Sequence, residues 1–220
     1  MALAIFDLDH TLLSGDSDHA WGQYLVDRGL VDPAIHQQRN DHFYEQYKSG
    51  SLDIHEYLEF AMRPLTQYDT EQMLAERERF LIERIDPLIT QHARDLIEKH
   101  RAAGDVLLII TATNGFVTYP IAARLDIEHI IAPHPEVLDG RYTGKTVGIP
   151  SFQGGKVTRL NDWIAEHQHS LEGSYFYSDS HNDLPLLRIV DHPVAVDPDD
   201  TLKAAAEAAG WPIISLRVAE

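Results

Sequence analysis

The chain has 220 residues and a formal net charge of −17, from 18 basic and 35 acidic residues. This charge repels phosphate backbones and anionic lipid surfaces, so it argues against nucleic acid or a membrane as the main partner. The chain contains no cysteine, which excludes disulfides, thiol catalysis and thiolate metal sites.

The N-terminus carries no basic segment, and Asp7 interrupts its apolar run, so it is not predicted to be a signal peptide. The longest apolar run, residues 106–110, is too short to cross a bilayer. We therefore expect a cytoplasmic protein, either a monomer or a homodimer. Its length suits one domain, or one domain that carries an insertion.

Residues 2–6 form the first predicted strand, which ends at Asp7. Asp9 and Thr11 follow at intervals of two residues. A change from strand to loop here would place both carboxylates at the mouth of a sheet, where they could hold a divalent cation or share nucleophilic and acid–base work. Taken alone, the spacing also fits a solvated acidic turn. A calcium-binding helix–loop–helix fits poorly, because Leu12 and Asp18 stand where it needs Gly and Glu.

Residues 15–86 contain helical patterns and no convincing strand. Four helices are predicted, ending near Gly29, Gly50, Pro64 and Leu81; Phe43 and Tyr47 share one face of the second, and Thr70 is expected to cap the fourth. Their apolar stripes are most simply packing faces. This block is a helical unit inserted directly after the acidic strand end.

From Pro87 onward, predicted helices alternate with short apolar strands, which is typical of βαβ units and a mostly parallel sheet. The strands are predicted at residues 106–110, 130–131, 175–177, 194–196 and 213–214. Asp139-Gly140 predicts a β-hairpin between them. The sequence thus predicts an α/β fold with a core at residues 1–14 and 87–220 and a helical cap at residues 15–86.

Four polar clusters stand at strand ends or helix starts. They are Asp7/Asp9/Thr11, Thr111/Thr113/Asn114, Lys156 and Asp179/Asn182/Asp183. In an open α/β sheet, ligands bind outside the carboxyl ends of the strands, and a helix N-terminus favours anions. Carboxylates, hydroxyls and one ammonium together predict a metal-assisted site for a phosphate group.

In this order, the four clusters resemble the motifs of the haloacid dehalogenase superfamily of phosphohydrolases. The resemblance covers nearly the whole chain and is closest to the phosphoserine phosphatase-like branch (subfamily IB), which includes histidinol-phosphate phosphatases. It implies a three-layer Rossmann-like core, with the helical insert as a cap of the C1 type.

The resemblance also implies a role for each motif residue. Asp7 would be the nucleophile that forms an aspartyl-phosphate, and Asp9 would be the general acid and then the base. Thr111 would bind the transferring phosphoryl group, and Lys156 would neutralise its charge. Mg²⁺ would be held by Asp7, by the main-chain carbonyl of Asp9 and by Asp179, with Asn182 and Asp183 in support.

The second acid, Asp9, favours a phosphatase or a phosphomutase over a dehalogenase, which needs no proton for its leaving group. The phosphatase would hydrolyse a small phosphomonoester, expected to carry an amine, such as histidinol phosphate or phosphoserine. The motifs around Thr111 and Asp179 lack the glycines usual in phosphoserine phosphatases, so phosphoserine specificity does not follow. A phospholigand-binding protein without catalysis is a third reading.

Substrate specificity is expected to come from the cap. Asp16 stands where the resembling phosphatases use an acid to bind the substrate amino group, although it equally suits an N-cap of the first cap helix. Further candidates for substrate binding are Arg63, Thr113 and Asn114, with Asp18 and His19 weaker. His10 is expected to be a solvated or sheet-facing side chain.

Overall fold

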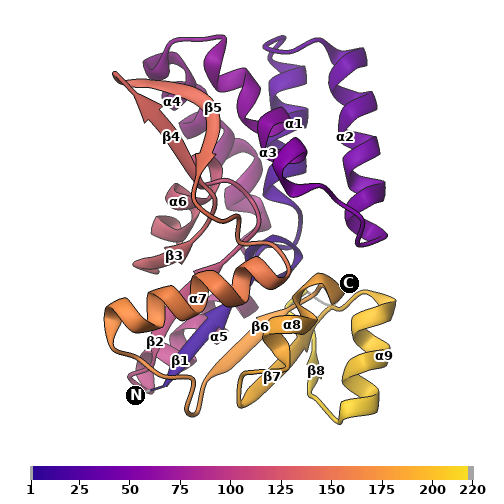
Figure 1. Ribbon diagram of the computed structural model, residues 1–220, viewed down its shortest axis with the longest axis vertical. Coiled ribbons are helices and arrows are strands. Elements are labelled where there is room, and N and C mark those ends of the chain that lie inside the picture. The colour runs from indigo at the N-terminus through magenta and orange to yellow at the C-terminus, as the bar shows by residue number, and fades with distance from the viewer. Residues whose placement is uncertain (1, 218–220) are drawn as a thin grey trace.

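The core of the protein is a six-stranded parallel sheet, seen in a computed structural model that describes residues 2–217 (Figure 1). The strand order is β3-β2-β1-β6-β7-β8, and every neighbouring pair is parallel. The strands are β1 (Leu3–Phe6), β2 (Val106–Ile110), β3 (His129–Ile131), β6 (Tyr175–Ser178), β7 (His192–Val196) and β8 (Ile213–Ile214). The predicted α/β class is therefore confirmed, and β1, which leads into Asp7, is central to the sheet.

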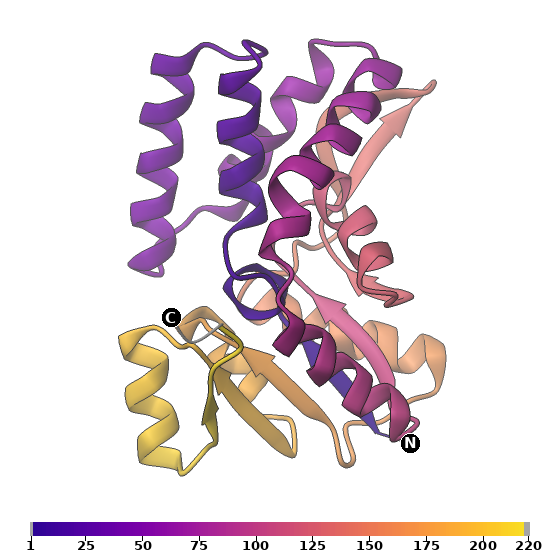
Figure 2. The same cartoon turned by 180° about the vertical axis from the view of Figure 1, so that it is seen from behind.

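Helices cover both faces of this sheet, which gives three layers. On one face, Ala4 and Phe6 of β1 belong to the same buried cluster as α5 (Gln91–Ala102) and α6 (Gly115–Arg124). On the other face, Leu3 and Ile5 pack with α7 (Gly154–His167), α8 (Leu184–Leu187) and α9 (Asp200–Ala209). Figure 1 shows α7 in front of the sheet, and Figure 2 shows α5 in front of it from behind. Burial on both faces explains why the strands are continuous apolar runs.

The segment between β1 and α5 is helical, as predicted. Its helices are α1 (Ser17–Asp27), α2 (Pro33–Lys48), α3 (Ile54–Met62) and α4 (Thr70–Phe80). Short helical turns follow at Arg63–Thr66, Leu81–Ile85 and Asp86–Leu88. The side chains of Asp16, Asp32 and Asp53 accept hydrogen bonds from amides of the first turns of α1, α2 and α3, so each caps its helix. We call residues 17–85 the helical insert below.

A β-hairpin from the second half of the chain lies against the helical insert. It consists of β4 (His134–Leu138) and β5 (Arg141–Val147), paired antiparallel around the predicted Asp139-Gly140 turn. The hydroxyl of Thr70 donates a hydrogen bond of 3.0 Å to the carbonyl of Gly140. The sequence predicted this hydroxyl as the cap of α4, but it is used instead to bind the hairpin.

The predicted domain division places this hairpin in the core, whereas the fold places it beside the insert (Figure 1). The boundaries at residues 14/15 and 86/87 stay a prediction, and residues 1 and 218–220 of the predicted core lie outside the described residues. Among residues 2–217, no helix is long and apolar enough to cross a bilayer.

Candidate active site

The loop after β1 turns sharply and carries the first acidic pair. The residue pairing of β1 with β6 ends at Phe6 and Tyr177, and the amide of Asp7 still donates to the carbonyl of Tyr177 at 2.9 Å. A tight turn at Leu8–Leu12 follows, in which the backbone of Asp9 and His10 is not helical and His10 has a positive φ of 55°. This turn carries Asp9 past the edge of the sheet.

Lys156, on the first turn of α7, joins two of the predicted motifs. Its ammonium donates to Oδ1 of Asp7 at 2.7 Å and to Oδ2 of Asp183 at 2.8 Å. Ser178 donates to the same oxygen of Asp183 at 2.7 Å. Lys156 is 3% exposed and Asp7 is 6% exposed, so these charges are held away from water. Their polar surroundings are fixed before any ligand arrives.

The buried carboxylates around Lys156 outnumber the cations. Burial, opposed by Lys156 and reinforced by Asp183, raises the pKa of Asp7 from 3.8 to about 7. Burial and the charges of Asp7 and Asp183 also raise the pKa of Asp179 well above its usual range. One ammonium among Asp7, Asp179 and Asp183 leaves negative charge uncompensated, which a divalent cation would offset.

The donors near Asp7 and Asp179 suit Mg²⁺ in kind, since all are oxygens. Among residues 2–217, however, no three His, Asp or Glu side chains converge on one point as a metal-ligand group. The side chain of Asp179 accepts a hydrogen bond of 3.1 Å from the hydroxyl of Thr11. A set of two carboxylates completed by a main-chain carbonyl and waters fits both observations.

Asp9 is held apart from this cluster and faces the start of α1. Its Oδ1 accepts the amide hydrogen of Ser17 at 2.6 Å, and its Oδ2 accepts the hydroxyl hydrogen of Thr113 at 2.8 Å. Burial and the charge of Asp16 raise the pKa of Asp9 to about 6, although these two hydrogen bonds lower it. A carboxyl group that titrates near neutral pH suits general acid–base work.

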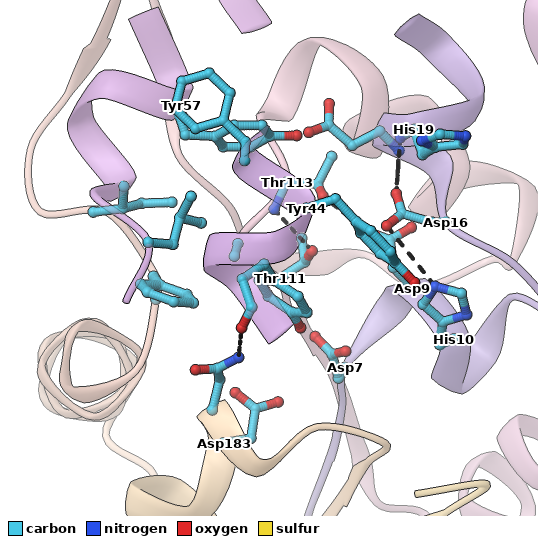
Figure 3. Close-up of a pocket in the computed structure, with 18 of the residues that line it drawn as sticks. Asp7, Asp9, His10, Asp16, His19, Tyr44, Tyr57, Thr111, Thr113 and Asp183 are labelled. Atoms are coloured by element: carbon cyan, nitrogen blue, oxygen red, sulfur yellow. Dashed lines mark hydrogen bonds and ion pairs between the residues drawn. The ribbon is translucent and has the colours of Figure 1, made fainter. Parts of the chain in front are cut away.

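Thr111 ends β2 with its side chain in the pocket. Its Oγ1 accepts the amide hydrogen of Thr113 at 3.1 Å, and its carbonyl accepts the hydroxyl hydrogen of Ser151 at 2.5 Å. Because Oγ1 is the acceptor in the first contact, its own hydrogen stays available for a phosphoryl oxygen. Figure 3 shows Thr111 between Asp7 and Thr113.

The helical insert closes the pocket through the turn between α2 and α3. Tyr47 donates to the hydroxyl of Ser180 at 3.2 Å, and its carbonyl accepts from the side chain of Asn182 at 3.3 Å. Gln153 donates to the carbonyl of Gly50 at 3.3 Å and to Oδ1 of Asn182 at 3.0 Å. Asn182, predicted as a supporting residue, therefore links the core to the insert.

One cavity is lined by most of the predicted motif residues and by one end of the insert (Figure 3), but Thr11, Asn114 and Asp179 are not among its lining residues. Its lining includes Asp7, Asp9, Thr111, Thr113, Lys156, Asn182, Asp183, Asp16, Asp18, His10 and His19. It also includes the aromatic side chains Phe43, Tyr44, Tyr47, Tyr57 and Phe152.

Several residues lie elsewhere than the sequence suggested. Arg63 lines a different cavity, between α2 and α3, and does not line the cavity that holds Asp7. Its position after α3 directs it away from the motifs. His10, expected to be solvated or sheet-facing, has a side chain that is 43% exposed and that also lines the Asp7 cavity, where its Nε2 lies 3.8 Å from Oδ2 of Asp16. Phe43 and Tyr47, predicted as packing residues, also line that cavity.

Sequence reasoning missed the residues that brace the motifs. Ser178 directly precedes Asp179 at a strand end, a position from which it could have been inferred. Arg217 gave no such signal, because only the fold brings it to the loop after β1. There its guanidinium donates to the carbonyls of His10 and Leu13.

A parallel sheet with buried acids, a lysine and hydroxyls at its carboxyl edge is the arrangement expected of an α/β enzyme that transfers or hydrolyses phosphoryl groups. The model of the family described as haloacid dehalogenase-like hydrolase matches residues 4–188. The chain belongs to this family.

Three further similarities agree with this assignment. The chain is 47% identical over 219 residues to a protein named histidinol-phosphatase from Neisseria meningitidis serogroup C (strain 8013), covering 98% of this chain and 99% of that one. A crystal structure of a protein of unknown function from Bordetella pertussis Tohama I has a TM-score of 0.92 at 44% identity and covers 98% and 99% of the two chains. A phosphoserine phosphatase structure with a phospho-aspartyl intermediate analogue has a TM-score of 0.70 at 18% identity and covers 98% and 93%, which is a likeness of fold.

These findings support a phosphoric monoester hydrolase of the haloacid dehalogenase superfamily.

Proposed function

We propose that this protein hydrolyses a small, amine-bearing phosphomonoester in a Mg²⁺-dependent reaction that passes through a phosphorylated Asp7. The observation that carries the proposal is the contact of Lys156 with both Asp7 and Asp183 at the sheet edge. Histidinol phosphate is the first substrate to test, because the relative at 47% identity bears the name histidinol-phosphatase. Phosphoserine is the alternative.

In the first step, a carboxylate oxygen of Asp7 attacks the phosphorus atom and the bond to the substrate alkoxy oxygen breaks. Lys156 offsets the charge of the phosphoryl oxygens, and the free hydrogen of the Thr111 hydroxyl binds one of them. Asp9, held by Ser17 and Thr113, gives its proton to the departing alkoxide. The products are the free alcohol and an aspartyl-phosphate.

In the second step, the ionised Asp9 takes a proton from water as that water attacks the phosphorus atom. The bond from phosphorus to Asp7 breaks, which releases inorganic phosphate and restores the Asp7 carboxylate. Asp9 thus works first as an acid and then as a base. A pKa near 6 suits both tasks, since each form is accessible near neutral pH.

Mg²⁺ would be held by the carboxylates of Asp7 and Asp179 and by the main-chain carbonyl of Asp9. When bound, it would supply positive charge that offsets the phosphoryl oxygens and keeps Asp7 ionised. The side-chain oxygens of Asp9 are already hydrogen-bonded to Ser17 and Thr113, which is consistent with only its carbonyl reaching the ion.

Release of inorganic phosphate from histidinol phosphate, phosphoserine, phosphoethanolamine and sugar phosphates, with Mg²⁺ and with EDTA, tests the proposal. We expect metal-dependent release from an amine-bearing ester. Acid-quenched enzyme should carry one phosphoryl group in wild type and none in Asp7→Asn, while Asp126→Asn, an exposed carboxylate with 95% side-chain exposure, should match wild type. An isomerised product without phosphate release would identify a phosphomutase and overturn the proposal.

A further inference from the structure

We propose that the pocket selects phosphomonoesters that carry a cationic group and rejects those that carry a carboxylate. We further propose that Asp18 is the residue that binds the substrate cation. This inference rests on the proposed function, because it concerns the substrate of the same site. It distinguishes the two candidate substrates of the proposed function, since phosphoserine carries a carboxylate and histidinol phosphate does not.

Among the residues that the structure describes, the pocket offers no free cation to a substrate carboxylate. Lys156 is the single Lys or Arg among the described residues that line the pocket, and its ammonium already contacts Asp7 and Asp183. The phosphoryl group would take up what remains of its charge. A second anionic group would therefore meet acids without a cation to receive it.

The two histidines of the pocket do not change this balance. Nδ1 of His19 lies 2.8 Å from the side-chain nitrogen of Asn40. An amide N–H can only donate, so Nδ1 is the acceptor in this contact and is not available as a donor to a substrate carboxylate. Nε2 of His10 lies 3.8 Å from Oδ2 of Asp16, so a carboxylate of the protein already occupies the place beside this ring.

Asp16 and Asp18 both line the pocket from the start of α1, but only Asp18 is free of a structural task. Oδ1 of Asp16 accepts the amide hydrogens of Asp18 and His19, each at 2.9 Å, so this carboxylate caps α1. Among the described residues, Asp18 accepts one hydrogen bond, a long one of 3.5 Å from the side-chain nitrogen of Asn114. Its second oxygen has no partner there.

Asp18 is also buried, with 9% of the residue exposed, and among residues 2–217 its carboxylate has no ion-pair partner. Burial, followed by the charges of Asp16 and Asp9, raises its pKa well above the usual range. An ammonium brought by the substrate would supply the missing partner and replace the lost hydration. A carboxylate brought to the same place would add to the repulsion.

The wall of the pocket that α2 and α3 contribute suits the binding of a planar ring. Tyr44 and Tyr57 come from α2 and α3, and Figure 3 shows them, like Asp16 and His19, above Asp7 and Asp183, which lie in the lower half of the view. Phe43 and Phe152 add apolar surface. Aromatic faces attract both flat rings and cations. A phosphomonoester with an ammonium and a planar ring, such as histidinol phosphate with its imidazole, offers one group to each of three places: the phosphoryl group to Lys156, the ammonium to Asp18 and the ring to the aromatic side chains.

The first test compares substrates that differ in one group and needs no variant. Serinol phosphate differs from phosphoserine only by a hydroxymethyl group in place of the carboxylate. Histidinol phosphate differs from its desamino analogue only by the ammonium. We expect kcat/KM to be at least about 10-fold higher for serinol phosphate than for phosphoserine, and for histidinol phosphate than for its analogue, as suits a charge-assisted contact.

The second test locates the effect at Asp18. Asp18→Asn should raise KM for histidinol phosphate about 10- to 100-fold, with a much smaller change in kcat, and should abolish the preference for the amine over the desamino analogue. Glu59→Gln is the matched control, because Glu59 is an exposed carboxylate of the insert that lines a different cavity. Its KM should equal that of wild type, and circular dichroism should show all variants folded.

The outcomes separate the two levels of inference. Equal kcat/KM for serinol phosphate and phosphoserine would overturn the selection against carboxylates even if Asp18→Asn does not fold. A KM that rises in Asp16→Asn and stays unchanged in Asp18→Asn would overturn the role of Asp18. If no ester is hydrolysed with Mg²⁺, including p-nitrophenyl phosphate, which carries neither group, the proposed function itself fails.

Discussion

The ammonium of Lys156 lies 2.7 Å from Oδ1 of Asp7, although the two residues are 149 positions apart in the sequence. Asp7 ends the central strand β1, and Lys156 begins the helix α7 that covers one face of the sheet. The contact therefore depends on both the sheet order and the packing of α7. It joins the proposed nucleophile to the group that offsets its charge.

Replacing Lys156 by Met should abolish phosphatase activity and destabilise the protein. The change leaves Asp7 and Asp183 buried without their cation, and removing one partner of a buried ion pair costs about 3–5 kcal/mol. Urea unfolding should show this loss at pH 8 and a smaller one at pH 5, where protonation of Asp7, whose pKa burial raises to about 7, removes one of the two uncompensated charges. Lys145→Met, at an exposed position of β5, should leave both properties unchanged. Equal losses at both pH values would contradict the electrostatic explanation.

Without metal, the protein should lose stability as the pH rises from about 4 to about 7. Burial raises the pKa of Asp7 to about 7 and that of Asp9 to about 6, from 3.8. Between the unfolded and folded pKa values the folded chain binds more protons than the unfolded chain, so the free energy of unfolding falls with pH. Thermal unfolding in EDTA should show the decline, and Mg²⁺ should reduce it by binding the ionised form.

The variant Asp7→Asn provides the control for this pH dependence, because it removes one of the two titrating groups. Its melting temperature in EDTA should fall less steeply over the same range. A wild-type melting temperature that rises from pH 5 to pH 7 in EDTA would show that other groups dominate the titration.

Loss of the Thr113 hydroxyl should impair the acid–base step. Thr113 donates to Oδ2 of Asp9, and this hydrogen bond lowers the pKa of Asp9. Thr113→Val should therefore raise that pKa and move the alkaline decline of kcat to higher pH, with kcat reduced about 10-fold as one positioning contact is lost. Asp9→Asn should cost about 10²–10⁴-fold. Thr158→Val, on the exposed face of α7, is the matched control. An unshifted pH profile in Thr113→Val would count against this role.

Arg217 should matter for the loop after β1 although it lies far away in the sequence. Its guanidinium donates to the carbonyls of His10, within the turn at Leu8–Leu12, and of Leu13, directly after it. Arg217→Ala should lower the free energy of unfolding by about 1–3 kcal/mol, as for charged hydrogen bonds, and should weaken Mg²⁺ binding measured by calorimetry. Arg188→Ala, at an exposed position after α8, should do neither. Unchanged Mg²⁺ affinity in a destabilised Arg217→Ala would restrict Arg217 to a structural role.

Local patterns in the sequence were enough to predict most of the secondary structure. The apolar runs of β1, β2 and β6 and the capping aspartates of α1 and α3 act over a few neighbouring residues, so they can be identified without the fold. Prediction was wrong for Thr70, whose hydroxyl binds Gly140 of the hairpin, because a hydroxyl near a helix start can serve either a cap or a tertiary contact.

The motif residues were identified from the sequence because chemistry restricts which residue types can do the work. Asp7, Thr111, Lys156 and Asp183 follow strands or begin a helix at one edge of a parallel sheet, so the βαβ pattern alone predicts that they meet. The sequence favoured Asp16 over Asp18 as the acid that binds the substrate amine, because Asp16 stands at the position that the resembling phosphatases use. Hydrogen bonding assigns Asp16 to the cap and leaves Asp18 facing the pocket.

The sequence by itself determined the fold class, the order of the elements and the polar residues at the strand ends, since these follow from hydrophobic periodicity and local capping. Only the tertiary structure decided that Arg63 faces another cavity, that Arg217 supports the loop after β1, and that the hairpin lies against the insert. Those features depend on contacts between residues far apart in the chain, and such contacts leave no periodic trace in the sequence.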